Sequence, residues 1–159
     1  MHRLLVVVLL VAGCSSGPGP STVGVPADFA TKALVVCQHA HDLKLAEGPF
    51  PLSAFNPTKP DASLFPEVGA FLKLTDATFG TWSSEMKALG SPSTGQSAWL
   101  DLIAAIERHV SLNADQIAAA KVGDTATFAK DYAAGLVTQA DLLKAATAAG
   151  VPDCAKVDR

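Results

Sequence analysis

The run His39-Ala40-His41-Asp42 contains imidazole and carboxylate groups, which are ligands for zinc, copper and nickel, and histidine also binds haem iron. The flanking residues have a helical pattern, and residues two apart on a helix point roughly 200° away from each other. His39 and His41 therefore cannot hold one ion from a single helix. Cys37 and His41 lie four residues apart and do share a helix face, so they form a second candidate metal pair.

Any metal site built around His41 needs a ligand from another helix. His109 is expected at about the same height along its helix as His41 along its own, and Tyr132 could join them from the following helix. A metal ion or haem bound by His41, His109 and Tyr132 is one hypothesis. In the other, which we favour, His39 is solvated, His41 and His109 lie at the edge of the core, and no cofactor is bound.

The sequence contains none of the common catalytic motifs. It has no Gly-x-Ser-x-Gly elbow, no Gly-rich phosphate loop and no His-Glu-x-x-His zinc helix. Its carboxylates are spaced as solvated helix faces and caps. The net charge of −3 and the pI near 5.7 differ from the basic character of nucleic-acid-binding proteins. We therefore expect a non-catalytic protein that does not bind nucleic acid.

Four further side chains fall on inward-facing positions of the expected helices. Trp82 and Trp99 could line a ligand pocket, although aromatic residues at such positions are more often core, which is our expectation. Asn113 and Gln139 are amides, and buried amides need hydrogen-bond partners. They would pair with each other, bind water, mark a polar cavity, or lie at the edge of the helix face in solvent.

All of these residues depend on helices for their placement. Apolar residues recur every three or four positions, and no segment shows sustained period-two alternation, which predicts an all-α domain. The third helix is expected to begin at Ser93 with a capping box to Gln96, and to be bent or broken near Asn113 if that residue starts a second cap. Because the second and third connections are short, we predict an antiparallel, up-down-up-down four-helix bundle. The expected helices span about 26–47, 64–89, 93–122 and 125–149.

The connection over residues 48–63 is long, contains four prolines and carries Phe50 and Phe55. Connections of this length are either functional or loose. In one interpretation, which we favour, the two rings cover one end of the bundle. In the other, they form a lid or a docking surface for a partner or an apolar ligand.

The N-terminus has the pattern of an export signal. A short basic start, residues 1–3, precedes nine apolar residues, 4–12, which are too few for the about 20 that a membrane-spanning helix needs. They fit the hydrophobic region of a signal peptide. The end of this region, Val11-Ala12-Gly13-Cys14, resembles the lipobox of bacterial lipoproteins. The resemblance covers residues 1–14 only, and it implies cleavage before Cys14 and a diacylglyceryl group on its thiol.

The other two cysteines are interpreted in the light of this resemblance. With Cys14 lipidated, Cys37 and Cys154 are left, and two thiols outside the cytoplasm usually pair. We therefore predict a disulfide that ties the first helix to the C-terminus, with the Cys37–His41 metal pair as the alternative. The chain divides into a signal peptide (1–13), a lipidated cysteine with a flexible Gly- and Pro-rich tether (14–25), and the four-helix domain (26–159).

Two functions fit this organisation. In the first, a lipid on Cys14 holds a non-catalytic lipoprotein on the extracytoplasmic face of the cell membrane, where its helices bind another envelope protein or form an envelope component. In the alternative, the protein carries a small ligand (a metal ion, haem or lipid) in the bundle interior or under the 48–63 connection. A cavity lined by His41 and His109 would favour the carrier, whereas a filled interior with an exposed apolar patch would favour the first function.

Overall fold

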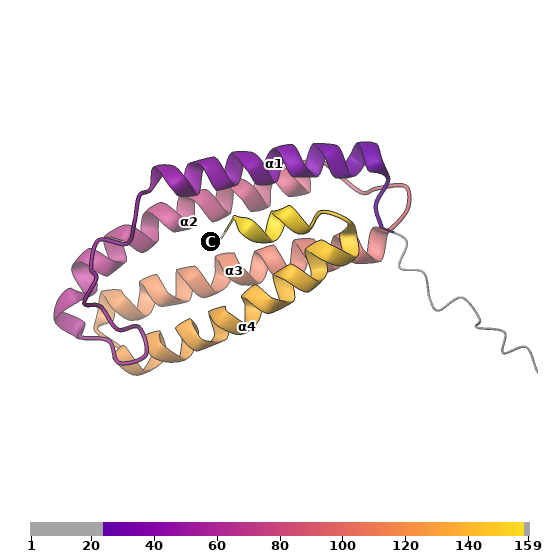
Figure 1. Ribbon diagram of the computed structural model, residues 1–159. Helices are drawn as coiled ribbons and strands as arrows, with labels where there is room; N and C mark the ends of the chain where they lie inside the picture. Colours follow the sequence, from indigo (N-terminus) through magenta and orange to yellow (C-terminus); the bar gives the residue numbers. More distant parts are fainter. Residues whose placement is uncertain (1–23, 158–159) are drawn as a thin grey trace, which may run out of the picture.

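The computed structural model describes residues 24–157; the expected signal peptide, Cys14 and most of the expected tether lie outside the described residues. Within this range the chain is helical and contains no strand. The four long helices are α1 (Ala27–Ala46), α2 (Phe65–Ala88), α3 (Gln96–Val122) and α4 (Thr125–Ala149), and two short 3₁₀ helices are η1 (Ala62–Leu64) and η2 (Pro152–Lys156) (Figure 1).

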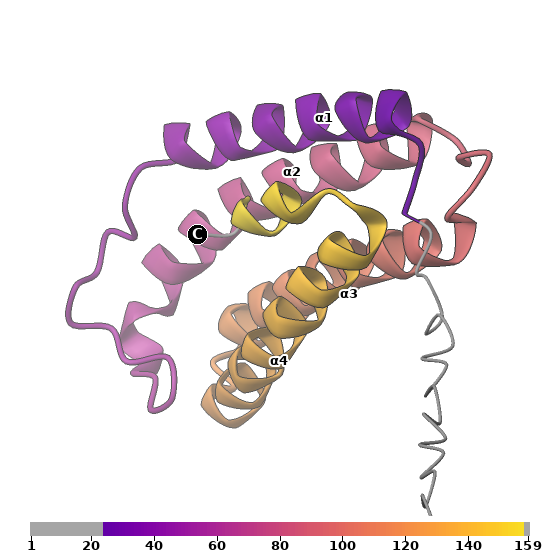
Figure 2. The ribbon, with the colours of Figure 1, turned by 45° about the vertical axis from the view of Figure 1, so that its right-hand side comes forward.

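Successive long helices run in opposite directions, which confirms the predicted up-down-up-down bundle (Figure 1). Helix α3 packs against both α2 and α4, whereas α1 packs against α2 and against η2. Because η2 contacts both α1 and α4, it bridges these two helices. Toward its C-terminal end, α1 draws away from the other three helices (Figure 2), whereas the start of α2 stays packed on α3 and α4 through Phe65, Ala120 and Phe128.

A disulfide between Cys37 in α1 and Cys154 in η2 closes the bundle, as predicted. Its Cα atoms are 5.0 Å apart, and the two cysteines are separated by 117 residues in the sequence. Nearby, the backbone N–H of Val25 donates a hydrogen bond to the carbonyl of Ala149 at 3.3 Å. The start of α1 and the end of α4 are thus tied together.

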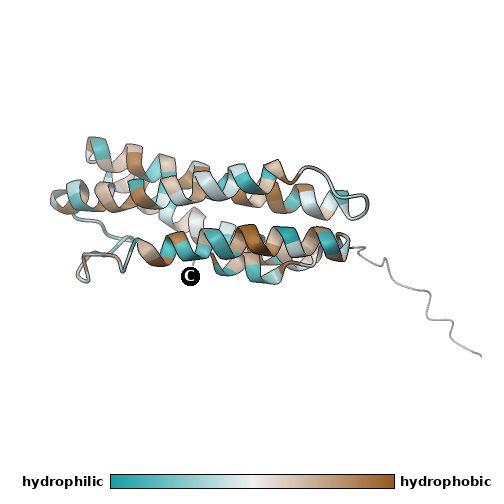
Figure 3. Cartoon of the chain, turned by 90° about the horizontal axis from the view of Figure 1, so that it is seen from above, coloured by the Kyte–Doolittle hydropathy of each residue, from teal (hydrophilic) through white to brown (hydrophobic). Residues whose placement is uncertain are grey.

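The main core lies between the helices in the half of the bundle nearest the disulfide. Trp82 and Trp99 are fully buried there, which confirms them as core residues, and the Trp99 ring meets Phe29 edge-on at 4.8 Å. Small residues such as Ala33 and Ala40 face the same core. Figure 3 shows apolar and polar residues alternating along the helices, which is the pattern of amphipathic segments packed on one face.

The third helix differs from the prediction in where it begins and in its continuity. It begins at Gln96 rather than Ser93, because Gly95 takes a left-handed conformation (φ 70°) that interrupts the helical turn. The Gln96 side chain donates to the Pro92 carbonyl instead of forming a capping box with Ser93. The helix also continues unbroken through Asn113, whose amide bonds to α2 and so does not cap a new segment.

Within residues 24–157, no helix combines the length and the apolar character that crossing a bilayer would require.

Candidate functional site

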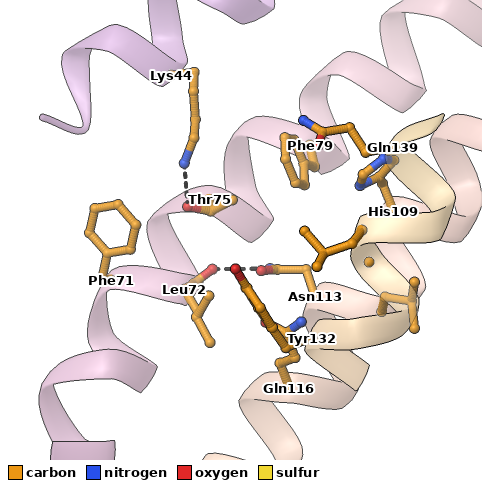
Figure 4. Close-up of a pocket in the computed structure, with 13 residues that line it drawn as sticks. Lys44, Phe71, Leu72, Thr75, Phe79, His109, Asn113, Gln116, Tyr132 and Gln139 are labelled. Atoms are coloured by element: carbon orange, nitrogen blue, oxygen red, sulfur yellow. Dashed lines mark hydrogen bonds between the residues drawn. The ribbon is translucent and has the colours of Figure 1, made fainter. Parts of the chain in front are cut away.

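Two adjoining cavities lie in the half of the bundle where α1 draws away from the other helices. The polar cavity measures about 220 Å³ and is bounded by α1, α2, α3 and α4 (Figure 4). The aromatic cavity also measures about 220 Å³ and is bounded by the 48–63 connection with α2, α3 and α4. Leu72, Gln116 and Tyr132 line both cavities, so we treat the two as one groove.

Amide and hydroxyl groups converge on the polar cavity. Asn113 and Gln139, the two inward-facing amides noted in the sequence, line it together with Gln116, Thr75 and Tyr132 (Figure 4). The Asn113 amide donates to the backbone carbonyl of Leu72 at 3.1 Å and to Asp76 Oδ1 at 3.2 Å. Of the roles considered for Asn113 and Gln139, the structure places them at a polar cavity.

Half of the residues that line the second cavity are aromatic. Phe50 lies 5.6 Å from Phe55 and 5.1 Å from Phe71, measured between ring centroids, and Phe55 meets Phe128 edge-on at 5.7 Å. These contacts anchor the long connection on the end of the bundle, which agrees with the first interpretation of its two phenylalanines. Phe50, Phe55 and Phe128 also line this cavity, together with Pro57, whereas Phe71 lines the polar cavity.

A buried ion pair stands at the edge of the polar cavity. Lys44 is the one lysine, arginine, aspartate or glutamate among the residues that line either cavity. Its ammonium lies 2.7 Å from Glu47 Oε2 and 2.9 Å from the Thr75 hydroxyl, and it lies 5.0 Å from the centre of the Phe71 ring. The hydroxyls of Thr75 and Thr78 donate to the Glu47 carboxylate at 2.8 and 2.6 Å.

The Glu47 carboxyl is stabilised in its charged form by this network. Its side chain is 6% exposed, and burial by itself raises the pKa of a carboxyl. Hydrogen bonds from Lys44, Thr78 and Thr75, with the positive charge of Lys44, outweigh that cost and hold the pKa below the ordinary value of 4.5. Glu47 is therefore ionised at neutral pH, and its negative charge lies directly against the Lys44 ammonium.

The pH dependence of folding should reveal this ion pair. Because the pKa of Glu47 is lowered on folding, its contribution is present above about pH 4.5 and is lost as the pH falls through the lower, folded-state value. We expect Glu47→Gln to cost about 1–3 kcal/mol in the free energy of unfolding at pH 7, and less at pH 3, measured by urea titration. The lowered pKa values of Asp61 and Asp124 cancel in this comparison, because both proteins keep those residues. An equal difference at both pH values would contradict the assignment.

The structure separates the residues of the predicted metal site. His109 and Tyr132 line the polar cavity, whereas His41 lines a different cavity beside Cys37 and η2. His39 is exposed and lies 2.9 Å from Glu85. His41 is therefore not placed with His109 because its side of α1 faces η2. Cys37 is bridged to Cys154, so the Cys37–His41 metal pair is not formed.

The search for metal-binding groups gives the same picture. Within the part of the chain that the structure describes, no three His, Cys, Asp or Glu side chains are grouped so that they could hold a metal ion. Lys44, Glu47 and Phe71 were not among the residues expected at a site. The spacing of Lys44 and Glu47, three residues apart near a helix end, was a readable signal of an ion pair, although not of a cavity.

Comparison with protein-family models, with curated proteins and with solved structures finds no match to this chain. Function is therefore inferred from the groove and from the N-terminal pattern. The groove combines a polar end, rich in hydrogen-bonding groups, with an aromatic end. Such an arrangement can hold a molecule that has one polar and one apolar part, and it can fix the orientation of that molecule.

Proposed function

We propose that this protein binds a small amphiphilic molecule in the groove, without transforming it. The observation that carries the proposal is the junction of the polar and aromatic cavities through the shared residues Leu72, Gln116 and Tyr132. Each cavity alone is smaller than the roughly 300–1,000 Å³ that is typical of small-molecule sites, and the two together fall within that range. The polar end would take the head of the molecule and the aromatic end its apolar part.

The proposal includes attachment to the extracytoplasmic face of the cell membrane through a lipid on Cys14. The lipobox-like sequence supports this location, and the Cys37–Cys154 disulfide is consistent with an oxidising compartment. A membrane-bound binding protein would hold its ligand close to the surface at which amphiphiles concentrate.

Replacing the expected lipidation site should release the protein from the membrane. In a bacterial host that processes lipoproteins, we expect the natural chain in the membrane fraction, with a mass increase that corresponds to acylation. Cys14→Ser should lack that increase, because serine has no thiol to receive the lipid. Cell fractionation shows which protein is in the membrane fraction, and mass spectrometry of the purified proteins measures the acyl mass. Ser15→Ala is the matched control and should stay acylated, and a Cys14→Ser chain with the same acyl mass would disprove the site.

Binding can be tested without the lipid, because the folded core is complete within residues 24–157. A chain covering residues 15–159, exported with an ordinary secretory signal, avoids the detergent that a lipidated protein would need. We expect it to bind the uncharged fluorescent probe N-phenyl-1-naphthylamine saturably at one site and to release the probe when a ten-carbon amphiphile is added. If neither the probe nor any such amphiphile binds saturably, the proposed function is wrong.

Interaction with another envelope protein, the first expectation from the sequence, is a second candidate. One observation favours it: Leu136, Val137 and Leu143 are exposed on α4, and Leu136 and Leu143, seven residues apart, lie on one helix face. Exposed apolar groups of this kind are common at protein interfaces. This candidate would become the stronger one if the groove failed to bind any amphiphile.

A further inference from the structure

We propose that the ligand of the groove is uncharged at its polar end, as in a monoacylglycerol, rather than a fatty acid or a cationic amphiphile. The inference rests on the proposed function and specifies the chemical class of the ligand. It follows from the charges and hydrogen-bonding groups along the groove.

The charge of Lys44 is already paired within the protein. Its ammonium is 2.7 Å from the Glu47 carboxylate, and the two side chains are 20% and 6% exposed. Charges this close and this shielded from water interact mainly with each other. An incoming carboxylate would have to share the ammonium with Glu47 and approach a second negative charge. A cationic head would meet the ammonium itself, so neither charged head gains a free partner.

The other polar groups of the groove include both donors and acceptors of hydrogen bonds. Gln116 and Gln139 each carry a donor and an acceptor, and the hydroxyl of Tyr132 can donate or accept. A hydroxyl, ester or amide head also presents donors and acceptors together, so it can match this set in both directions. A carboxylate presents acceptors only and a quaternary ammonium presents no donor, so each would leave some of these groups without a partner.

The aromatic cavity suits the apolar part of the ligand. The aromatic cavity contains no charged residue in its lining, and Phe50, Phe55 and Phe128 form its walls. An alkyl chain placed there loses contact with water and gains contact with these rings. The head is then directed toward Gln116 and Tyr132, which stand where the two cavities meet.

The test compares three probes with the same ten-carbon chain and different heads: 1-decanoylglycerol, decanoate and decyltrimethylammonium. Each displaces N-phenyl-1-naphthylamine from the protein at pH 7, below the concentration at which it forms micelles. We expect 1-decanoylglycerol to bind about tenfold or more tightly than either charged probe. Equal or tighter binding of a charged probe would overturn this inference and leave the proposed function intact. Absence of binding by all three would overturn both.

A variant tests whether the Lys44–Glu47 ion pair causes the preference for an uncharged head. Glu47→Gln keeps the shape of the side chain and one of the two acceptor oxygens that the threonine hydroxyls use, but it leaves the Lys44 charge uncompensated. We expect decanoate to bind about tenfold more tightly to this variant, with 1-decanoylglycerol changed by less than about twofold. Glu67→Gln, in an exposed position at the start of α2, is the matched control and should change neither. Circular dichroism confirms folding, and an unchanged preference in folded Glu47→Gln would overturn the inference.

Discussion

Replacing both Cys37 and Cys154 by alanine is expected to lower the free energy of unfolding by about 4 kcal/mol. The bridge joins residues 117 apart, and loop-closure entropy assigns about 4–5 kcal/mol to a loop of that length. Alanine is preferable to serine because both positions are buried, where a hydroxyl would lack a hydrogen-bond partner. The melting temperature should fall by roughly 10–20 °C for a domain of this size.

Urea titration of the two proteins, with thermal melts by circular dichroism, measures the effect. The natural disulfide can also be removed by reductant, and the reduced protein should approach the stability of the double variant. Reductant should leave the double variant itself unchanged, which serves as the control. A loss of less than about 1 kcal/mol would mean that the bond does not restrict the unfolded chain as the entropic account requires.

Gly135→Leu is expected to abolish ligand binding, with a loss of about a hundredfold or more in affinity for N-phenyl-1-naphthylamine. Gly135 lies within α4 and lines the polar cavity, and a Cβ atom at this position would meet no other atom within 4 Å. The leucine side chain can therefore occupy the cavity without displacing its neighbours. Because glycine disfavours a helix interior, the change should also raise stability by about 0.8–1 kcal/mol.

The control for this variant is Gly80→Leu. Gly80 is likewise inside a helix, α2, and a Cβ atom there also meets nothing within 4 Å, but the residue lines neither cavity of the groove. It should gain similar helix stability and keep full affinity for the probe. If Gly135→Leu folds and binds as tightly as Gly80→Leu, the groove is not the binding site.

The helices could be predicted from the sequence because their ends depend on local chemistry. Asp124 caps α4 by accepting a hydrogen bond from the Thr127 backbone N–H at 3.0 Å. Gly123 and Gly150 end α3 and α4 in left-handed conformations, with φ of 74° and 82°. Short connections between such helices then determine the antiparallel order. The disulfide was also predictable, because only one pairing remains once Cys14 is set aside.

The groove could not be predicted in the same way, because it depends on how far α1 lies from α4. Helix η2, a five-residue segment, lies against both of these helices, and its position depends on the whole fold. The role of Glu47 depends on Thr75 and Thr78, which lie 28 and 31 residues away on another helix. The height of His41 along α1 did not predict its neighbours, because the direction of its side chain decides which cavity it lines.

The junction of α1, α4 and η2 also has a consequence for the order of folding. Helices α2, α3 and α4 each pack against the next helix in the sequence, and contacts between neighbouring segments form fastest. Helix α1 meets η2 only when the ends of the 117-residue loop come together, which is the slower event. We therefore expect the two thiols to meet in a chain whose other helices are already assembled. The disulfide would then stabilise a structure that helix packing has already formed, and it would not direct the chain toward that structure.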